Sequence, residues 1–276
     1  MALTIGVKGS LTSFQWIRQG DFMQTTTALY KSIYSSPHHV ETKLDIYSSD
    51  GETEVGSVRS NNIIEAKTSR SLFETNDFSI GCCVAGEIDI KFFPIFVSID
   101  SVYSVREFTA TIPRMAMLKL YFRLVSVDDS SVVSEWLPKG VYFVDSRQTE
   151  KSSGAITLHG FDAMLKTEDL YTDSSNTEYP ISDINMVSHI ATAIGVEVDS
   201  RTSDVITGEY NVGLPIGYSM REVLSGIAIP YCANFCISDE GKLLTVSAIV
   251  VEPENGILMD NVSGLAIEIG GVHIIV

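Results

Sequence analysis

The sequence predicts an α+β fold that is mainly β, and three observations lead to this class. Several short segments alternate apolar and polar residues at regular spacing, which is typical of a barrel or sandwich rather than of a parallel βαβ sheet. From about residue 170 the pattern changes to helix, strand, helix and hairpin. The composition, 45% hydrophobic and 20% charged over 276 residues, is that of a globular chain of about two domains.

The N-terminal segment, residues 1–40, is predicted to be helical. Residues 13–35 form one helix or a helix pair, because apolar residues recur there at roughly helical spacing. These apolar positions are Trp16, Ile17, Phe22, Leu29 and Ile33. Gly20 interrupts the pattern, and Pro37 closes it because proline does not continue a helix.

A strand-rich block, residues 41–169, is predicted to form a β-barrel-like domain. Residues 40–47 alternate apolar and polar side chains, and Asp50-Gly51 supplies a turn after them. Further strands are expected over residues 57–66, 87–93, 108–112, 118–127, 141–149 and 155–161. The block ends in one or two helical turns over residues 162–169.

A small α/β module is predicted over residues 170–248, after a polar loop at residues 172–178 that marks the best domain boundary. Ser182 or Asp183 caps its first helix, and Gly195 stands where a left-handed residue ends a helix. The apolar stripe of this helix comprises Val187, Ile190, Ala191 and Ile194.

The module continues with a short strand over residues 196–199. Ser219 and Glu222 then form a capping box, in which each side chain satisfies the other residue's free backbone N–H. The buried face of this second helix comprises Val223, Leu224, Ile227 and Ala228. Pro230 ends the helix, and a β-hairpin follows over residues 235–246.

Strands of a second β domain are predicted over residues 249–276. Residues 264–276 end inside a strand-like apolar run, whereas a natural C-terminus is more often polar and frayed. We therefore expect that the chain has been cut from a longer one.

The chain is acidic, with 19 Lys and Arg against 35 Asp and Glu and a formal net charge of -16. A surface of this sign repels phosphate, and aromatic residues do not interleave with Lys/Arg clusters, so no specific nucleic-acid binding is expected. No apolar run approaches the ~20 residues that span a bilayer. The N-terminus lacks a basic segment followed by an apolar one, so no secretory signal is expected.

The chain contains four cysteines: Cys82, Cys83, Cys232 and Cys236. An adjacent pair and a C-x3-C spacing do not make a disulfide framework in a chain of this length. Zinc is the alternative, with His38 and His39 as further ligands, but the spacing contains no C-x2-C pair. The apolar surroundings indicate small buried hydrophobes, so no metal site is predicted.

Catalytic motifs such as the nucleophile elbow, the Walker A loop and H-E-x-x-H do not occur. The closest catalytic interpretation pairs His159, as a base, with Asp145 or Asp162 and one of many serines. We favour a strand-end residue that bonds a turn. Glu87 and Asp89 share one strand face and could hold Ca²⁺, but they more often form the wet side of a strand.

Four acids are predicted to lie in turns, with spacings that match no EF-hand loop: Asp128, Asp129, Asp239 and Glu240. His189 is expected on a solvated helix face. The sequence therefore predicts no catalytic, cofactor-binding or metal-ligating residue, no cofactor, and a protein that is not an enzyme.

Five stretches, taken in order, carry a resemblance. They are residues 81–92, 139–147, 156–168, 181–196 and 217–228, the last continuing through Asn234-Phe235 to residues 239–243. In that order they resemble tail hub or tail-tip proteins encoded by phages and prophages of Gram-positive bacteria, a group similar in fold to the baseplate hub of contractile-tailed phages.

The resemblance implies a β-barrel-like tube domain, an α/β module and the start of a second β-barrel domain. It implies a structural protein of the phage tail, made in the bacterial cytoplasm and placed in the virion, that forms a ring-shaped hub or tip beneath the tail tube. The implied assembly is a homotrimer, with the tail tube, distal tail and tape-measure proteins as partners, and the resemblance implies no catalytic residue.

An acidic strand face such as residues 87–91 would then let DNA pass through the ring without sticking. Two alternatives stay open. One is a tail-associated cell-wall hydrolase with His159 as base, and the other is a receptor- or carbohydrate-binding β module.

Overall fold

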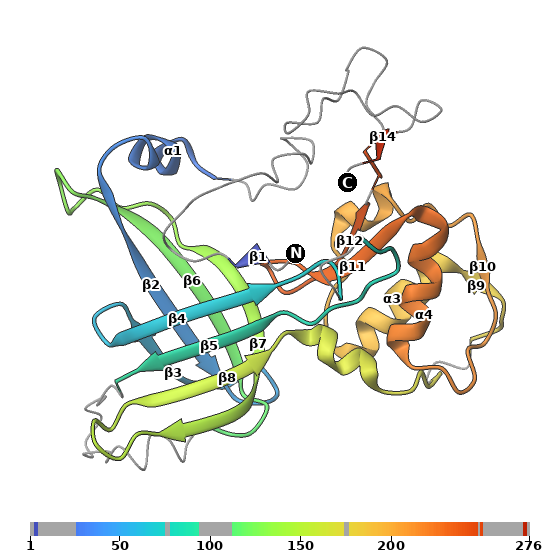
Figure 1. Ribbon diagram of the computed structural model, residues 1–276, viewed down its shortest axis with the longest axis horizontal. Coiled ribbons are helices and arrows are strands. Elements are labelled where there is room, and N and C mark those ends of the chain that lie inside the picture. The colour runs from blue at the N-terminus through green and yellow to red at the C-terminus, as the bar shows by residue number, and fades with distance from the viewer. Residues whose placement is uncertain are drawn as a thin grey trace.

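The computed structural model describes residues 3–4, 26–74, 78–93, 112–173, 177–247, 249–250 and 273–274. Within these residues a curved antiparallel sheet lies beside a module of helices and a hairpin (Figure 1). The chain is mainly β, as predicted. The helix expected before residue 26, the strand expected over residues 108–111, and most of the second β domain fall outside the described residues.

The sheet has the strand order β1-β4-β5-β8-β7-β6-β2-β3, and all neighbouring strands are antiparallel. Its strands are β1 (Leu3–Thr4), β2 (His38–Tyr47), β3 (Glu54–Arg59), β4 (Ile63–Arg70), β5 (Glu87–Phe92), β6 (Met117–Ser126), β7 (Leu137–Thr149) and β8 (Ile156–Phe161). β3 lies at one edge and β4 next to the other, yet only residues 60–62 separate them, so the sheet curls until these strands meet at one end. No ladder joins β3 to β4 among the described residues, so the strands form no closed barrel.

Buried apolar side chains alternate with more exposed ones along the strands, and the buried ones line the concave side of the sheet. In β5 the side chains of Ile88, Ile90 and Phe92 are buried, whereas Glu87 and Asp89 are exposed. The buried side chains of all strands meet in one core: Leu44, Ile46, Val58, Ile88, Ile90, Phe92, Ile112, Ala116, Leu118, Leu120, Tyr142, Val144, Ile156 and Leu158. Burial of this apolar surface stabilises the curl, because a flat sheet would leave the same face in water.

The predicted strands are confirmed where alternation is strict, as β2, β5, β6, β7 and β8, with shifted ends. The single strand expected over residues 57–66 is wrong, because the chain turns between β3 and β4. There the Asn62 N–H donates to the Arg59 carbonyl at 2.8 Å. Asn61-Asn62 is turn chemistry that apolar alternation alone does not register. The turn predicted at Asp50-Gly51 is confirmed, since Gly51 has φ +76°.

The N-terminal helix is confirmed over its described part as α1 (Ala28–Tyr34), which precedes β2. Thr27 caps it, because its side chain accepts a hydrogen bond from the Tyr30 N–H at 3.1 Å. Ile33 is the buried side chain of this helix, and the helix ends before Pro37 as predicted.

The module follows β8. In the described chain its helices are η1 (Ala163–Glu168), α3 (Asp183–Ile194), η2 (Ser200–Asp204), α4 (Met220–Ala228) and η3 (Ile229–Tyr231), of which η1, η2 and η3 are 3₁₀. Its hairpin is β11 (Ala233–Ile237) and β12 (Leu243–Ser247). Its two-residue strands are β9 (Ile181–Ser182) and β10 (Asn211–Val212). β13 (Ile249–Val250) and β14 (His273–Ile274) lie beyond the module.

Two helix ends of the module follow the sequence signals, whereas Ser182 stands at the N-cap of α3 without a side-chain capping hydrogen bond. The Ser219 N–H donates to Glu222 Oε2 at 2.7 Å, and the Glu222 N–H donates to Ser219 Oγ at 3.2 Å, so the capping box is confirmed. Gly195 ends α3 in the left-handed region with φ +76°. The apolar stripes predicted on both helices are buried. The strand expected over residues 196–199 is wrong, because only Val198 makes an isolated bridge there, to Leu243.

The tip of the β11–β12 hairpin packs against the end of the sheet. Gly241 lies in this tip with φ +83°, and a Cβ added there would stand 2.7 Å from Cγ2 of Val141 on β7. Only glycine combines this backbone conformation with so close a contact. The hairpin therefore holds the module against the sheet.

We expect Gly241→Ala to lower the free energy of unfolding by about 1–3 kcal/mol, since it adds both a strained φ and an overlap with Val141. Gly226→Ala is the matched control, because Gly226 lies in α4 with no heavy atom within 4 Å of the added Cβ. That substitution should raise stability by up to about 1 kcal/mol through helix propensity. Urea unfolding followed by circular dichroism measures both, and equal stability of the two variants would contradict the close contact.

Candidate functional site

His159, the candidate base, lies on the convex face of β8. Its Nδ1 is 2.9 Å from Oδ1 of Asp89, which stands directly opposite on β5. The predicted partners Asp145 and Asp162 are therefore both wrong. The favoured interpretation of a strand-end residue that bonds a turn is wrong too, because His159 is paired on both sides within β8 and bonds a neighbouring strand. Ser146 is the cross-strand neighbour of His159 on β7, but no hydrogen bond joins their side chains in the described structure.

The convex face around Glu87 and Asp89 is exposed, as the wet-side interpretation predicts. Its acids are partly neutralised, since Asp89 meets His159 and Lys91 lies 3.0 Å from Glu150. Within the described ranges, no group of three or more His, Cys, Asp and Glu side chains could hold a metal ion.

The four cysteines are free. Cys82, Cys83 and Cys236 are buried, as predicted for small hydrophobes, whereas Cys232 is half-buried. Burial raises the pKa of the Cys83 and Cys236 thiols to about 12, so both stay protonated at neutral pH. A protonated thiol is a poor nucleophile, and both side chains pack in apolar clusters.

The sheet and the module meet through a charged clamp at the hairpin tip. Arg70, the last residue of β4, donates to Asp239 Oδ1 at 2.6 Å, and Lys139 of β7 lies 3.6 Å from Asp239 Oδ2. The sequence predicts Asp239 to be a turn acid. It is a turn residue, but its carboxylate joins two strands of the sheet to the hairpin.

Asp162 is the buried carboxylate of the junction, with 2% of its surface exposed. Its Oδ2 accepts the Gly86 N–H at 2.8 Å, and its Oδ1 accepts the Met164 N–H at 2.9 Å. Thus one side chain caps η1 and ties it to the segment that enters β5. Burial raises the pKa of Asp162 to about 6, against the lowering effect of both N–H groups and of the nearby arginines.

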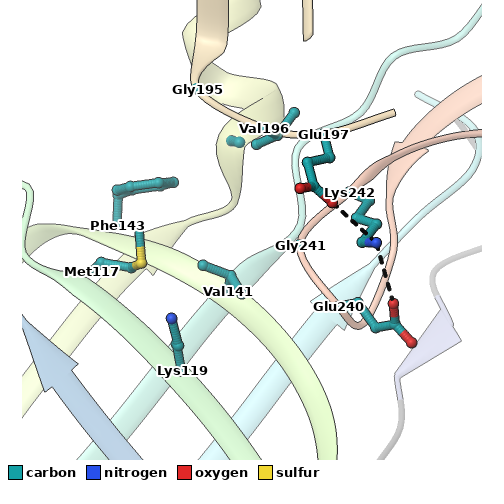
Figure 2. Close-up of a pocket in the computed structure, with 11 residues that line it drawn as sticks. Met117, Lys119, Val141, Phe143, Gly195, Val196, Glu197, Glu240, Gly241 and Lys242 are labelled. Atoms are coloured by element: carbon teal, nitrogen blue, oxygen red, sulfur yellow. Dashed lines mark ion pairs between the residues drawn. The ribbon is translucent and has the colours of Figure 1, made fainter. Parts of the chain in front are cut away.

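A cleft of about 200 Å³ lies between the sheet and the module (Figure 2). On one side stand Met117, Lys119, Val141 and Phe143 of the sheet. On the other side Lys242 pairs with Glu197 at 3.1 Å and lies 4.0 Å from Glu240. Lys166 packs on the Phe143 side chain, with its Nζ 3.7 Å from the ring centroid, and donates to the Ile194 carbonyl.

Cations and aromatic rings alternate across the convex face of β2 and β6. Lys43 Nζ lies 4.4 Å from the ring centroid of Tyr121, and Arg123 Cζ lies 4.6 Å from that of Trp136. We call Lys43, Tyr47, Lys119, Tyr121, Arg123 and Trp136 the cation–aromatic strip. The expectation that aromatic and basic residues do not interleave is wrong for the folded sheet, because strand pairing unites residues that lie far apart in sequence.

The strip is rigid because its members hold one another. Arg123 also bonds Glu41 on the facing strand at 2.7 Å, and Lys43 pairs with Asp45 at 2.7 Å. Lys119 stands 4.6 Å from the ring centroid of Tyr47. Each exposed cation–ring contact contributes about 0.5–1 kcal/mol, so the set favours one arrangement of long side chains.

Three solved structures are similar to this chain. The 43 kDa tail protein of prophage MuSo2 from Shewanella oneidensis has 15% sequence identity and a TM-score of 0.48, over 77% of this chain and 56% of that one. The tail protein from Neisseria meningitidis MC58 has 11% identity and a TM-score of 0.44, over 77% and 52%. A lidless PdpA–VgrG complex has 7% identity and a TM-score of 0.44, over 76% and 35%.

The chain thus spans about half the length of the two tail proteins that it matches. No protein-family model and no curated protein matches the sequence. No helix in the described part of the chain is long and apolar enough to cross a membrane.

We expect Asp162 to make the stability pH-dependent. Its folded pKa of about 6 exceeds the ordinary value of 3.8, so its stabilising contribution is complete below pH 3.8 and is lost as the pH rises through 6. A shift of about two units corresponds to about 3 kcal/mol. Asp162→Asn does not titrate, so the stability advantage of the wild type over this variant should shrink by up to that amount between pH 4 and pH 8.

Urea unfolding at each pH measures this difference. Asp162→Asn also loses one of the two N–H contacts, which lowers its stability at every pH but leaves the slope as the readout. Asp89→Asn, on the exposed face, is the control and should leave the slope nearly unchanged. A wild-type advantage that stays constant from pH 4 to pH 8 would show that Asp162 has an ordinary pKa.

Proposed function

We propose that the chain is a structural component of the tail of a phage or prophage of a Gram-positive bacterium, forming a ring-shaped hub or tip beneath the tail tube. One observation carries the proposal. The five stretches that resemble tail hub proteins lie far apart in sequence, yet in the fold they converge on the junction between sheet and module.

Direct contacts link these stretches to one another. Gly86 of the first stretch donates to Asp162 of the third, and Lys139 of the second pairs with Asp239 of the last. Lys166 of the third donates to the Ile194 carbonyl of the fourth, at 3.1 Å.

The last helix completes the joint. Arg221 of α4 lies 2.6 Å from Glu168 at the end of η1. The resemblance therefore concerns a joint that sets the position of the module on the sheet, which is a structural feature rather than a reaction site.

The proposed role depends on the shape and the surface charge of the chain and needs no catalytic residue. The curled sheet serves as the tube domain of a homotrimeric ring, and the neighbours in the virion are the tail tube, distal tail and tape-measure proteins. A net charge of -16 suits a ring through which DNA moves, because an acidic lumen repels phosphate over about one Debye length, ~8 Å at physiological salt. The chain is proposed to be no enzyme and to hold no cofactor.

We expect light scattering at high protein concentration to give three times the chain mass of 30.2 kDa. Negative-stain electron microscopy of the same sample should show rings with three-fold symmetry and a central hole that admits a B-DNA duplex. A monomer at every concentration, without rings, would refute the hub proposal.

A cell-wall hydrolase is the second candidate, because the Asp89–His159 pair is a carboxylate-oriented imidazole of the kind that general bases use. We expect the chain to release no soluble fragments from purified peptidoglycan and His159→Ala to behave like the wild type. Thermal unfolding should also change little, since the pair is partly exposed. Peptidoglycan cleavage that disappears in His159→Ala and persists in the control His38→Ala would establish the enzyme instead.

A further inference from the structure

The cation–aromatic strip is a positive area on a chain whose net charge is -16. The convex side chains of β2, β3 and β6 include the cations Lys43, Arg59, Lys119 and Arg123 and the carboxylates Glu41, Asp45 and Glu54. Two of these carboxylates are already occupied, since Glu41 bonds Arg123 and Asp45 bonds Lys43 and Ser57. These two pairs neutralise each other, so Arg59 and Lys119 against Glu54 leave this face with a net positive charge of one, where the molecule as a whole is strongly negative.

The strip has the residue types that anchor protein interfaces. Trp, Tyr and Arg dominate the residues whose loss most weakens protein contacts. Here Trp136, Tyr121 and Arg123 are half-buried and are held by their cross-strand neighbours. Because these side chains are already ordered, a partner that binds them costs little additional conformational entropy.

The opposite half of the convex face is acidic. Glu65 on β4 and Glu87 and Asp89 on β5 point outward, and Glu150 joins them at the end of β7. Lys67 and Lys91 are the cations among them, so carboxylates are in excess.

The two halves lie on opposite sides of the molecule. Along the curled sheet, β5 and β2 are separated by β8, β7 and β6 in one direction and by β4 and β3 in the other. Figure 1 shows β4 and β5 crossing in front of β2 and β6. A contact between two different patches of the same chain is head-to-tail, and such contacts generate a ring when the rotation closes.

We propose that the partner of the cation–aromatic strip is a second copy of this chain, which presents the acidic convex face of its β4 and β5. This inference rests on the proposed ring and names the surfaces that join its subunits. The contact reduces the electrostatic repulsion between subunits, because copies that each carry a charge of -16 repel unless oppositely charged faces meet.

Charge reversal on each face and on both together tests the pairing in the full-length chain. Arg59→Glu with Arg123→Glu reverses the strip, and Glu87→Lys with Asp89→Lys reverses the acidic face. Each pair should raise the protein concentration needed for half-assembly about tenfold or more, as measured by light scattering. The four substitutions combined should restore assembly.

Lys31→Glu with Lys151→Glu is the control for the strip variant, because it lowers the net charge by the same amount at exposed positions outside the strip. It should leave assembly close to that of the wild type. If the double variant of the strip proves unstable in thermal unfolding, Arg59→Glu alone replaces it, because Arg59 lies at an exposed strand end.

Two results overturn the inference. Rings that assemble normally after reversal of the strip would exclude a second copy as its partner and would leave the proposed hub intact. Loss of assembly without rescue in the combined variant would show that these faces do not meet. A wild-type chain that never assembles is a different result, since it refutes the hub itself.

Discussion

The carboxylate of Asp162 fixes how the sheet continues into the module. It stands directly after β8, accepts the Met164 N–H to start η1, and accepts the Gly86 N–H to anchor the chain before β5. One buried side chain thus orients two segments that are 76 residues apart. The remaining junction contacts, from the Arg70–Asp239 bond to the packing of Gly241 on Val141, hold the hairpin of the same module to the sheet.

The junction separates two cores that otherwise share little. One core fills the concave side of the sheet, and the other lies between α3, α4, η1 and the hairpin. Phe143 of β7 belongs to the second core, although its neighbours Tyr142 and Val144 belong to the first. A strand whose adjacent side chains enter different cores cannot shift its register by one residue without exposing both sets, so the joint is rigid as well as close.

Local sequence signals predicted the elements, and only folding revealed which residues meet. Alternation identified β5, and the capping box and Gly195 fixed the helix ends, because each signal lies within a few residues. Asp162 and Asp239 were noticed as acids, but their partners Gly86 and Arg70 are distant in sequence. The cation–aromatic strip was missed for the same reason, since Lys43 meets Tyr121 only through strand pairing.

The placement of charge then follows from the fold. Burial raises the pKa of the Asp162 carboxyl inside the joint although two N–H groups bond it, while Arg70 and Lys139 pair with Asp239 and Arg221 pairs with Glu168. Packing constrains the residues of the convex face least. On that face cations are in excess on β2 and β6, and acids are in excess on β4 and β5. An even mixture of the same residues would serve solubility equally well. Because cations and acids are segregated onto opposite sides, each copy has two different faces. A ring of head-to-tail contacts requires two different faces on each copy.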